Sequence, residues 1–209
     1  MQDSDRLRDA LRRDFPTVVP SADRAWSRAP ALRVIDCVLS LNRNYDRFVV
    51  PRLDTFERTF PQVITLCQLR DLIASYDSPD AFVRDALNYR HADRAQTLSE
   101  VVDYIVGTVL GNRQIEELEQ LQQWAVGARP SDYQTLRIRG FGLAGFQYLR
   151  MLFGANTTKP DVHICRYVQA ALGRHVSDTA ALTLLEEAVR GDSIKLRDID
   201  TAIWEDSAR

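Results

Sequence analysis

The stretch Leu-Arg-Ile-Arg-Gly-Phe-Gly-Leu at residues 136–143 predicts two helices joined by a sharp turn. Apolar residues recur at three- and four-residue steps on both sides of it, which is the period of an α-helix. Gly140 and Gly142 let the backbone turn sharply and leave room for a phosphate. The free N–H groups at the start of the second helix form an anion site. We expect Phe141 to point inward and lock the helices together; a plain helical corner is the alternative.

The helical period continues through the rest of the chain. Helices are predicted at residues 5–15, 32–41, 45–60, 66–75, 80–87, 92–110, 114–126, 131–138, 143–153, 162–172, 178–189 and 195–204. Pro51 fits the third only where a helix starts or kinks. No segment alternates like a strand. We therefore expect an all-α protein of two helical lobes with a cleft between them. Residues 1–30 and 128–209 form one lobe, with the hairpin at about 131–153, and residues 31–127 form the other.

The composition is that of an ordinary globular protein. Of the 209 residues, 45% are hydrophobic and 27% are charged, and no apolar run approaches the roughly 20 residues that cross a membrane. The charged N-terminal segment does not resemble a secretory signal, so we expect a cytoplasmic protein. The three cysteines, Cys37, Cys67 and Cys165, lack metal-site spacing. We expect them to be buried apolar residues, with no metal or other cofactor.

The net charge of −2 hides a basic segment. Residues 129–174 contain seven Arg or Lys and two Asp, a net charge of +5, so the remainder of the chain carries −7. A basic segment on a mildly acidic body favours a polyanionic partner that approaches from one side. The alternative is that these arginines only solvate helix faces.

A second motif, Lys159-Pro160-Asp161-Val162-His163, follows the hairpin by about twenty residues. Asp161 stands where the helix at 162–172 begins, and Pro160 stiffens the approach to it. Free N–H groups and the helix dipole stabilise a carboxylate at such a position. A fixed carboxylate beside a phosphate-binding turn points to chemistry on a nucleic acid. A simple helix cap is the alternative role for Asp161.

Together these motifs resemble the helix-hairpin-helix (HhH-GPD) DNA glycosylase superfamily, which includes endonuclease III. The family's hairpin, Leu-Pro-Gly-Val-Gly, is followed by a helix and then by a Val-Asp-Thr-His-type segment. Here residues 138–142 read Ile-Arg-Gly-Phe-Gly and residues 160–163 read Pro-Asp-Val-His, in the same order. Weaker similarity at residues 38–46 and 198–204 extends the resemblance over roughly residues 30 to 205. Asn42 takes the place of the glutamine that fills the gap left by the extracted base.

The resemblance implies that Asp161 is the catalytic residue. A carboxylate there stabilises the oxocarbenium-like sugar or activates water. The lysine with which bifunctional members form a Schiff base is replaced by Ala144, which cannot form an imine. The resemblance therefore implies a monofunctional glycosylase, with Lys159 left open as a substitute for that lysine. The cysteine cluster that binds iron–sulfur in endonuclease III is missing. Asp36 could replace the glutamate of the adenine-specific members only if it faces the cleft.

The resemblance also implies a binding surface. The expected partner is duplex DNA with a damaged or mismatched base, bound by a monomer that is nucleoid-associated when on DNA. The expected DNA-binding residues are Arg139, Gly140, Phe141, Gly142, Leu143, Gly145, Asn42, Arg43 and Lys159. The expected base pocket is lined by Cys37, Tyr45, Trp124, Phe146 and Tyr148, each of which could be a core residue instead. Two other functions stay open: an inactive protein that binds distorted or branched DNA, and a helical protein-interaction module.

Overall fold

The computed structural model describes residues 2–20, 27–111 and 114–207. Regular structure within these ranges is entirely helical, which confirms the all-α prediction. The α-helices are α1 (Asp3–Asp14), α2 (Pro30–Leu39), α3 (Val50–Thr59), α4 (Leu66–Ala74), α5 (Pro79–Leu87), α6 (Ala92–Tyr104), α7 (Glu117–Gly127), α8 (Tyr133–Leu136), α9 (Leu143–Leu152), α10 (Val162–Leu172), α11 (Asp178–Ala188) and α12 (Leu196–Ser207). Two π-helical turns, η2 (Tyr45–Val49) and η3 (Ile105–Val109), and one 3₁₀ turn, η4 (Pro130–Asp132), complete the set.

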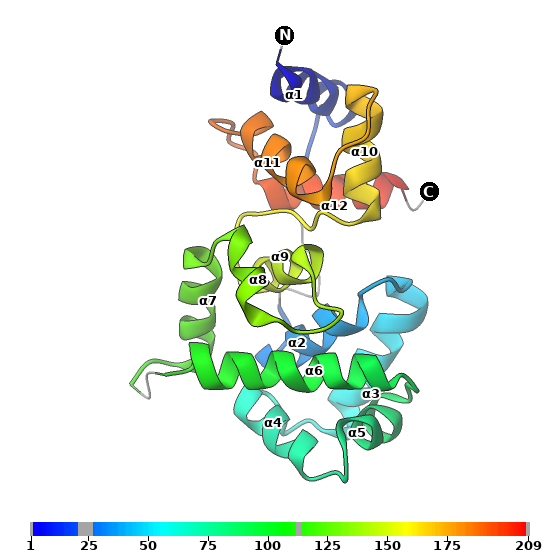
Figure 1. The fold of residues 1–209 in the computed structure, drawn as a ribbon, viewed down its shortest axis with the longest axis vertical. Coiled ribbons are helices and arrows are strands. Elements are labelled where there is room, and N and C mark those ends of the chain that lie inside the picture. The colour runs from blue at the N-terminus through cyan, green and yellow to red at the C-terminus, as the bar shows by residue number, and fades with distance from the viewer. Residues whose placement is uncertain (1, 21–26, 112–113, 208–209) are drawn as a thin grey trace.

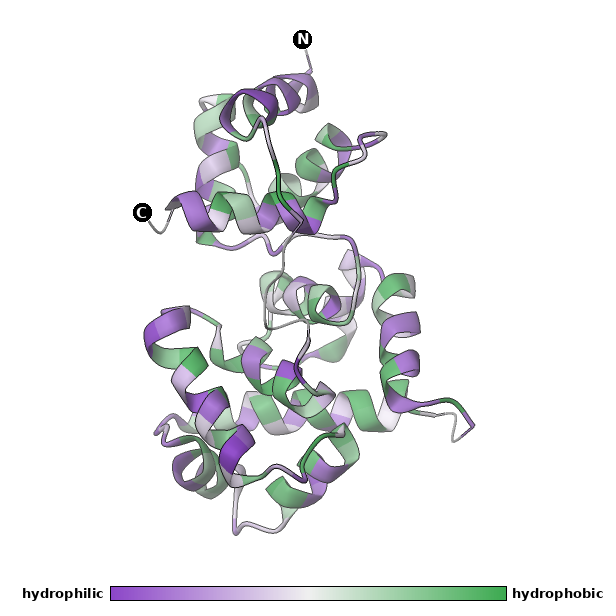
Figure 2. Ribbon diagram, turned by 180° about the vertical axis from the view of Figure 1, so that it is seen from behind, coloured by the Kyte–Doolittle hydropathy of each residue, from purple (hydrophilic) through white to green (hydrophobic). Residues whose placement is uncertain are grey.

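The helices enclose two separate hydrophobic cores. The larger core contains buried residues from Ala31 to Ala155, and we call residues 30–155 the large body. The smaller core lies among α1, α10, α11 and α12, and we call residues 3–15 and 162–207 the terminal body. Figure 1 shows the two bodies one above the other, with the first and last helices of the chain together in the upper one. Along most helices green and purple segments alternate in Figure 2, as expected of amphipathic helices with one buried face.

The boundary between the cores differs from the expected lobe boundary at residue 128. The hairpin and α9 belong to the large body, because Phe146, Leu149 and Phe153 are fully buried in its core. Helix α9 is buried along nearly its whole length, where it packs on α2 and α7. A helix that is apolar on nearly every side is a central core helix. The boundary therefore falls after Ala155, in the loop that leads to α10.

Local sequence explains most helix ends. Pro51 lies in the first turn of α3, where its missing N–H costs nothing, and the preceding π turn absorbs the change of direction. The helix expected at 131–138 is shorter, because Arg137 takes a left-handed backbone conformation with φ 52°. The hairpin therefore joins a single α-turn to α9. No helix in the described ranges is long and apolar enough to cross a membrane.

Candidate active site

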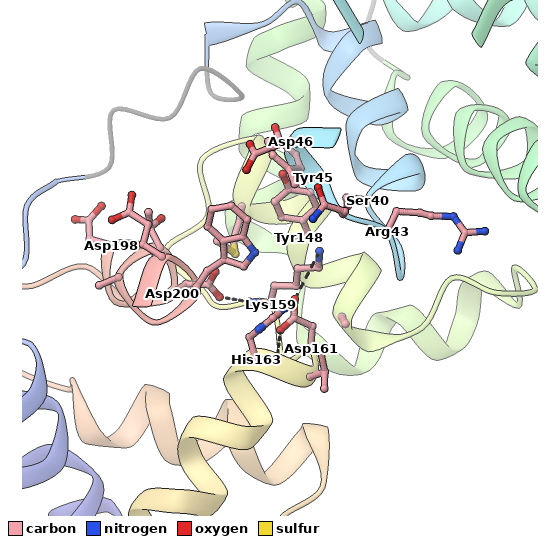
Figure 3. Close-up of a pocket in the computed structure, with 18 of the residues that line it drawn as sticks. Ser40, Arg43, Tyr45, Asp46, Tyr148, Lys159, Asp161, His163, Asp198 and Asp200 are labelled. Carbon is pink, nitrogen blue, oxygen red and sulfur yellow. Dashed lines mark hydrogen bonds and ion pairs between the residues drawn. The ribbon is translucent and has the colours of Figure 1, made fainter. Parts of the chain in front are cut away.

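A pocket of about 970 Å³ lies between the two bodies. The large body contributes the turn after α2 and one face of α9, and the terminal body contributes the start of α10 and one face of α12. The segment before α10 and residues 17–20 close the remaining sides. Figure 3 shows the side chains of these elements converging on one space. The pocket is large enough to receive a nucleobase with part of its sugar.

Asp161 stands at the edge of this pocket as the N-cap of α10. Its Oδ1 atom accepts hydrogen bonds from the backbone N–H groups of His163 at 2.9 Å and Ile164 at 3.3 Å. These bonds fix the carboxylate and leave Oδ2 on the side of Lys159, whose Nζ is 3.8 Å away. The predicted cap is therefore present, and the same carboxylate also faces the pocket.

Lys159 lies inside the pocket wall rather than on the outer surface. Its side chain is only 16% exposed. The ammonium group lies 4.5 Å from the centre of the Tyr148 ring, on the opposite side from Asp161. Both a carboxylate and an aromatic face thus stabilise this cation. Lys159 was expected to bind the DNA backbone. Because it lies inside the pocket wall, it could do so only if a phosphate reached the mouth of the pocket.

Two of the expected base-pocket residues, Tyr45 and Tyr148, do line the pocket. The tyrosine hydroxyls donate hydrogen bonds to the two carboxylate oxygens of Asp36, at 2.7 Å from Tyr45 and 3.1 Å from Tyr148. Asp36 itself is fully buried behind the rings and does not line the pocket. It therefore orients the rings and does not take the place of a catalytic glutamate. Trp204 of α12 completes the aromatic wall, edge-on to Tyr45 at 6.2 Å.

Asp200 of α12 is a second carboxyl group in the pocket wall that the sequence analysis did not single out. Its Oδ1 atom accepts hydrogen bonds from the Thr158 hydroxyl at 2.5 Å and from the Lys159 N–H at 2.7 Å. Burial raises the pKa of this carboxyl to about 7, and the negative charge of Asp161 contributes to the increase. Asp200 is half-buried, and its Oδ1 atom is turned toward the segment at 158–159. The pocket therefore contains two carboxyl groups with different environments.

The hairpin lies beside the pocket rather than in its wall. Gly140 and Gly142 are exposed, whereas Phe141, Leu143 and Gly145 are buried. Phe141 points inward as expected, and a Cβ atom at Gly145 would approach its ring to 3.0 Å. The side chains of Phe141 and Leu143 therefore cannot contact DNA, and Gly145 is covered by its neighbours. The start of α9 still reaches the site, because Ala144 lines the pocket. No side chain caps this helix, so its first backbone N–H groups have no side-chain acceptor.

The exposed arginines near the hairpin have partners of their own. Arg139 is exposed and its guanidinium lies 3.6 Å from the carboxylate of Asp93. Arg94 donates to the carbonyl oxygen of Gly140 at 3.4 Å and to that of Leu41 at 3.4 Å, which ties the hairpin to the turn after α2. Both guanidinium groups therefore have partners within the protein, and Arg137 is a further exposed cation beside the hairpin.

Asn42 and Arg43 occupy the turn after α2 at the rim of the pocket. Asn42 has a left-handed backbone with φ 59°, which small polar residues tolerate. The Arg43 side chain points away from Asp161 in Figure 3. Its guanidinium donates to the Tyr89 hydroxyl at 3.2 Å and lies 5.7 Å from the Phe48 ring centre. Asn42 is thus placed at the mouth of the pocket, and Arg43 beside it.

Three expected base-pocket residues lie elsewhere. Cys37 is fully buried in the large core, where its thiol donates to the Gly145 carbonyl at 3.3 Å, and burial raises the pKa of that thiol. Phe146 is also fully buried, and Trp124 of α7 packs against it with ring centres 5.8 Å apart. These residues fill the core because α9 turns that face toward α2 and α7. The cysteines also differ from expectation: Cys67 is exposed and Cys165 is half-buried.

The basic segment at 129–174 is only partly a surface. Arg150 is buried, where it donates to the Ala125 carbonyl at 3.0 Å and to the Gln147 side chain at 2.7 Å. Arg174 pairs with Asp3 of α1. These two cations serve the fold. Exposed basic residues such as Arg137 and Arg139 flank the hairpin instead.

Several more acidic side chains line the pocket. These are Asp46 of η2 and Asp198 and Glu205 of α12, and His163 lines it too, with its Nδ1 2.8 Å from the Ser207 hydroxyl. Their positions along the chain gave no signal, because residues from η2 and α12 meet only in the folded protein. Among the described residues, no group of three or more His, Cys, Asp or Glu side chains is arranged to hold a metal ion.

Comparison with known proteins gives one family match. A family model described as "Domain of unknown function (DUF8548)" matches residues 6–208, nearly the whole chain. No curated protein and no solved structure matches the chain.

Proposed function

The chain belongs to the family of domains of unknown function DUF8548, and we propose that it is a monofunctional DNA glycosylase with the two-lobed HhH-GPD fold. In this proposal the protein binds duplex DNA across the mouth of the pocket. A damaged base leaves the helix and enters the space between the two bodies. Water then hydrolyses the glycosidic bond and leaves an abasic site.

One observation carries the proposal. The carboxylate of Asp161 is fixed by two backbone N–H groups at the N-terminus of α10, and it lines a pocket of about 970 Å³ with three aromatic side chains. An aspartate that only capped a helix would not need to line a pocket. The aromatic rings of Tyr45 and Trp204 give the pocket apolar surface for an extruded base, and stacking on such surfaces stabilises unpaired bases. The ring of Tyr148 supports the wall behind Lys159, whose ammonium group lies 4.5 Å from its centre.

The chemistry needs a fixed negative charge more than it needs a proton donor. As the bond between the base nitrogen and C1′ breaks, its electrons leave with the base and the sugar becomes positively charged. A carboxylate held by two N–H donors is already oriented, so it stabilises this charge without reorganising. Water adds its oxygen to C1′, and its proton passes to Asp161 or to the departing base. The products are the free base and an abasic sugar.

The distribution of charge suggests where the DNA backbone runs. Acidic residues occupy the end of the pocket formed by α12 and repel phosphates there. The exposed glycine turn, the open N-terminus of α9 and the arginines around the hairpin lie on the other side. A phosphate bound by the N–H groups at the start of α9 places the neighbouring nucleotide near Ala144, which lines the pocket.

A screen of duplexes, each with a single modified base, tests the proposal. We expect base release from at least one lesion, detected as strand cleavage only after treatment with hot alkali. Asp161→Asn keeps the helix cap and the shape of the side chain but removes the charge. We expect it to lower excision by about a thousandfold or more and to change the dissociation constant for DNA by less than about threefold.

The other outcomes are equally informative. Excision at the wild-type rate by Asp161→Asn would show that this carboxylate is not the catalytic group. Salt-dependent binding to DNA without excision of any lesion would favour the inactive DNA-binding protein, for which the Asn42 and Ala144 substitutions leave room. Negligible DNA affinity at low salt would favour the protein-interaction module.

A further inference from the structure

The segment that carries Lys159 and Asp161 is held by side chains from both bodies. Thr157 and Thr158 are buried, although the segment contains no helix or strand. On the side of the large body, Gln147 of α9 donates to the Thr157 hydroxyl at 2.6 Å. On the side of the terminal body, Asp200 of α12 accepts from the Thr158 hydroxyl and the Lys159 N–H.

We propose that Asp200 is a positioning residue, which fixes Lys159 and Asp161 in the pocket through its hydrogen bonds to Thr158 and Lys159. This role rests on the proposed glycosylase function. One oxygen atom of Asp200 binds two consecutive residues of the segment, at 2.5 Å and 2.7 Å. Asp161 follows Lys159 by two residues, and the Asp161 N–H donates a hydrogen bond to the Lys159 carbonyl at 2.6 Å. These hydrogen bonds, together with the backbone of Lys159 between them, therefore connect α12 to the residue that caps α10.

Rigidity at this point matters for the reaction. A displacement of about 1 Å at a reacting group can lower a rate about a hundredfold. The N-cap bonds orient the Asp161 carboxylate relative to α10, but they do not fix α10 relative to the large body, which supplies Tyr148. Asp200 and Gln147 together hold the intervening segment between the two bodies. Without Asp200, the Thr158 hydroxyl and the Lys159 N–H lose their acceptor in a site with little solvent.

Because the positioning role involves the charge of Asp200, the rate of excision should depend on pH. The other titratable or charged groups that line the pocket are Lys159 and Asp161 on the segment, His163 on α10, Asp198 and Glu205 on α12, and Arg43, Tyr45, Asp46 and Tyr148 on the large body. A carboxylate accepts stronger hydrogen bonds than a carboxylic acid, and its negative charge also favours a positively charged sugar. Since the pKa of Asp200 is about 7, excision should increase through neutral pH as this group ionises.

Three variants test the proposal under single-turnover conditions. Asp200→Ala removes the acceptor, and we expect excision to fall by about 10- to 100-fold with DNA affinity unchanged within about twofold. Asp200→Asn keeps an acceptor oxygen, so most of the rate should remain while the increase through neutral pH disappears. Asp206→Asn changes the net charge by the same amount on the same helix at an exposed position outside the pocket, and should match the wild type.

Hydrogen exchange gives a readout that needs no substrate. We expect the peptide covering residues 157–161 to exchange faster in Asp200→Ala but not in Asp206→Asn. Wild-type excision and exchange in Asp200→Ala would overturn the positioning role and leave the glycosylase proposal intact. A pH step that survives in Asp200→Asn belongs to another group and would overturn the role of the Asp200 charge. Absence of excision by the wild type would overturn the glycosylase function and, with it, this role.

Discussion

The hairpin turn at residues 137–142 and the segment at 156–161 both flank the pocket, but they are built by different means. The hairpin depends on backbone conformation: Arg137 and Gly140 have positive φ angles, and its carbonyl groups accept bonds from Thr97 and Arg94. The segment depends on side chains, because Gln147 and Asp200 hold it from either side. The hairpin thus presents main-chain N–H groups, whereas the segment presents a charged pair. In the proposed glycosylase, the N–H groups of the hairpin would bind a phosphate and the charged pair of the segment would act at the sugar.

The carboxyl group of Asp200, which holds the segment from α12, should make the free energy of unfolding depend on pH. The pKa of Asp200 is about 7 in the folded protein and near 3.8 for the free side chain. Because the folded-state pKa is raised, the folded state binds more protons than the unfolded state between these values. The contribution of the Asp200 carboxyl group to the free energy of unfolding is therefore fully present below about pH 4 and is lost as the pH rises to about 7.

Asp200→Asn should remove this dependence. We expect its melting temperature, relative to that of the wild type, to rise by several degrees between pH 4 and pH 7 and then to stay constant. Thermal unfolding followed by circular dichroism across this range provides the measurement. An offset between variant and wild type that does not change with pH would show that the carboxyl is not buried as a proton-holding group.

The stability of the hairpin region should instead be sensitive to the volume of the side chain at position 145. A Cβ atom at Gly145 would lie 3.0 Å from the Phe141 ring and 3.1 Å from a methyl group of Leu41. We expect Gly145→Ala to destabilise the protein by about 1–3 kcal/mol through overpacking. Gly127→Ala is the control, since nothing lies within 4 Å of that position and alanine favours a helix. Equal urea midpoints for the two variants would contradict the close packing of the hairpin on α2.

The same contrast explains what could be predicted from the sequence. Helical periodicity placed the helices, and Pro160-Asp161 placed a cap, because these signals are local. Of the five residues predicted to line the pocket only two do so, since the sequence does not show which helix face meets which neighbour. Cys37 and Phe146 therefore fill a core, while Tyr45 and Tyr148 line the pocket. Asp200 was overlooked because its partners, Thr158 and Lys159, lie about forty residues earlier in the chain.

A substitution at Gly142 can separate the proposed binding of phosphate by the hairpin from the stability of the protein. This residue is the N-cap of α9, it has no side-chain cap, and nothing lies within 4 Å of a Cβ atom there. Gly142→Asp should leave stability equal or a few tenths of a kcal/mol higher, because aspartate is a good N-cap. Its negative charge should weaken DNA binding about tenfold, equivalent to about 1.4 kcal/mol.

Gly142→Asn is the matched control, because asparagine caps the helix equally well without the charge. Fluorescence anisotropy with a lesion duplex at two salt concentrations distinguishes the two variants. Equal affinities for Asp and Asn at this position would mean that no phosphate binds at the start of α9.

The smallest expected effect concerns Lys159 and strand cleavage. A lyase reaction requires an amine that reaches C1′, whereas the Lys159 amine is held between the Asp161 carboxylate at 3.8 Å and the Tyr148 ring at 4.5 Å. In the proposed superfamily, the position at which bifunctional members carry lysine corresponds to Ala144. We therefore expect borohydride to trap no covalent adduct with abasic DNA, and Lys159→Gln to leave this result unchanged. An adduct formed by the wild type and lost in Lys159→Gln would make Lys159 a nucleophile. The segment would then supply both the carboxylate and the amine of a bifunctional enzyme.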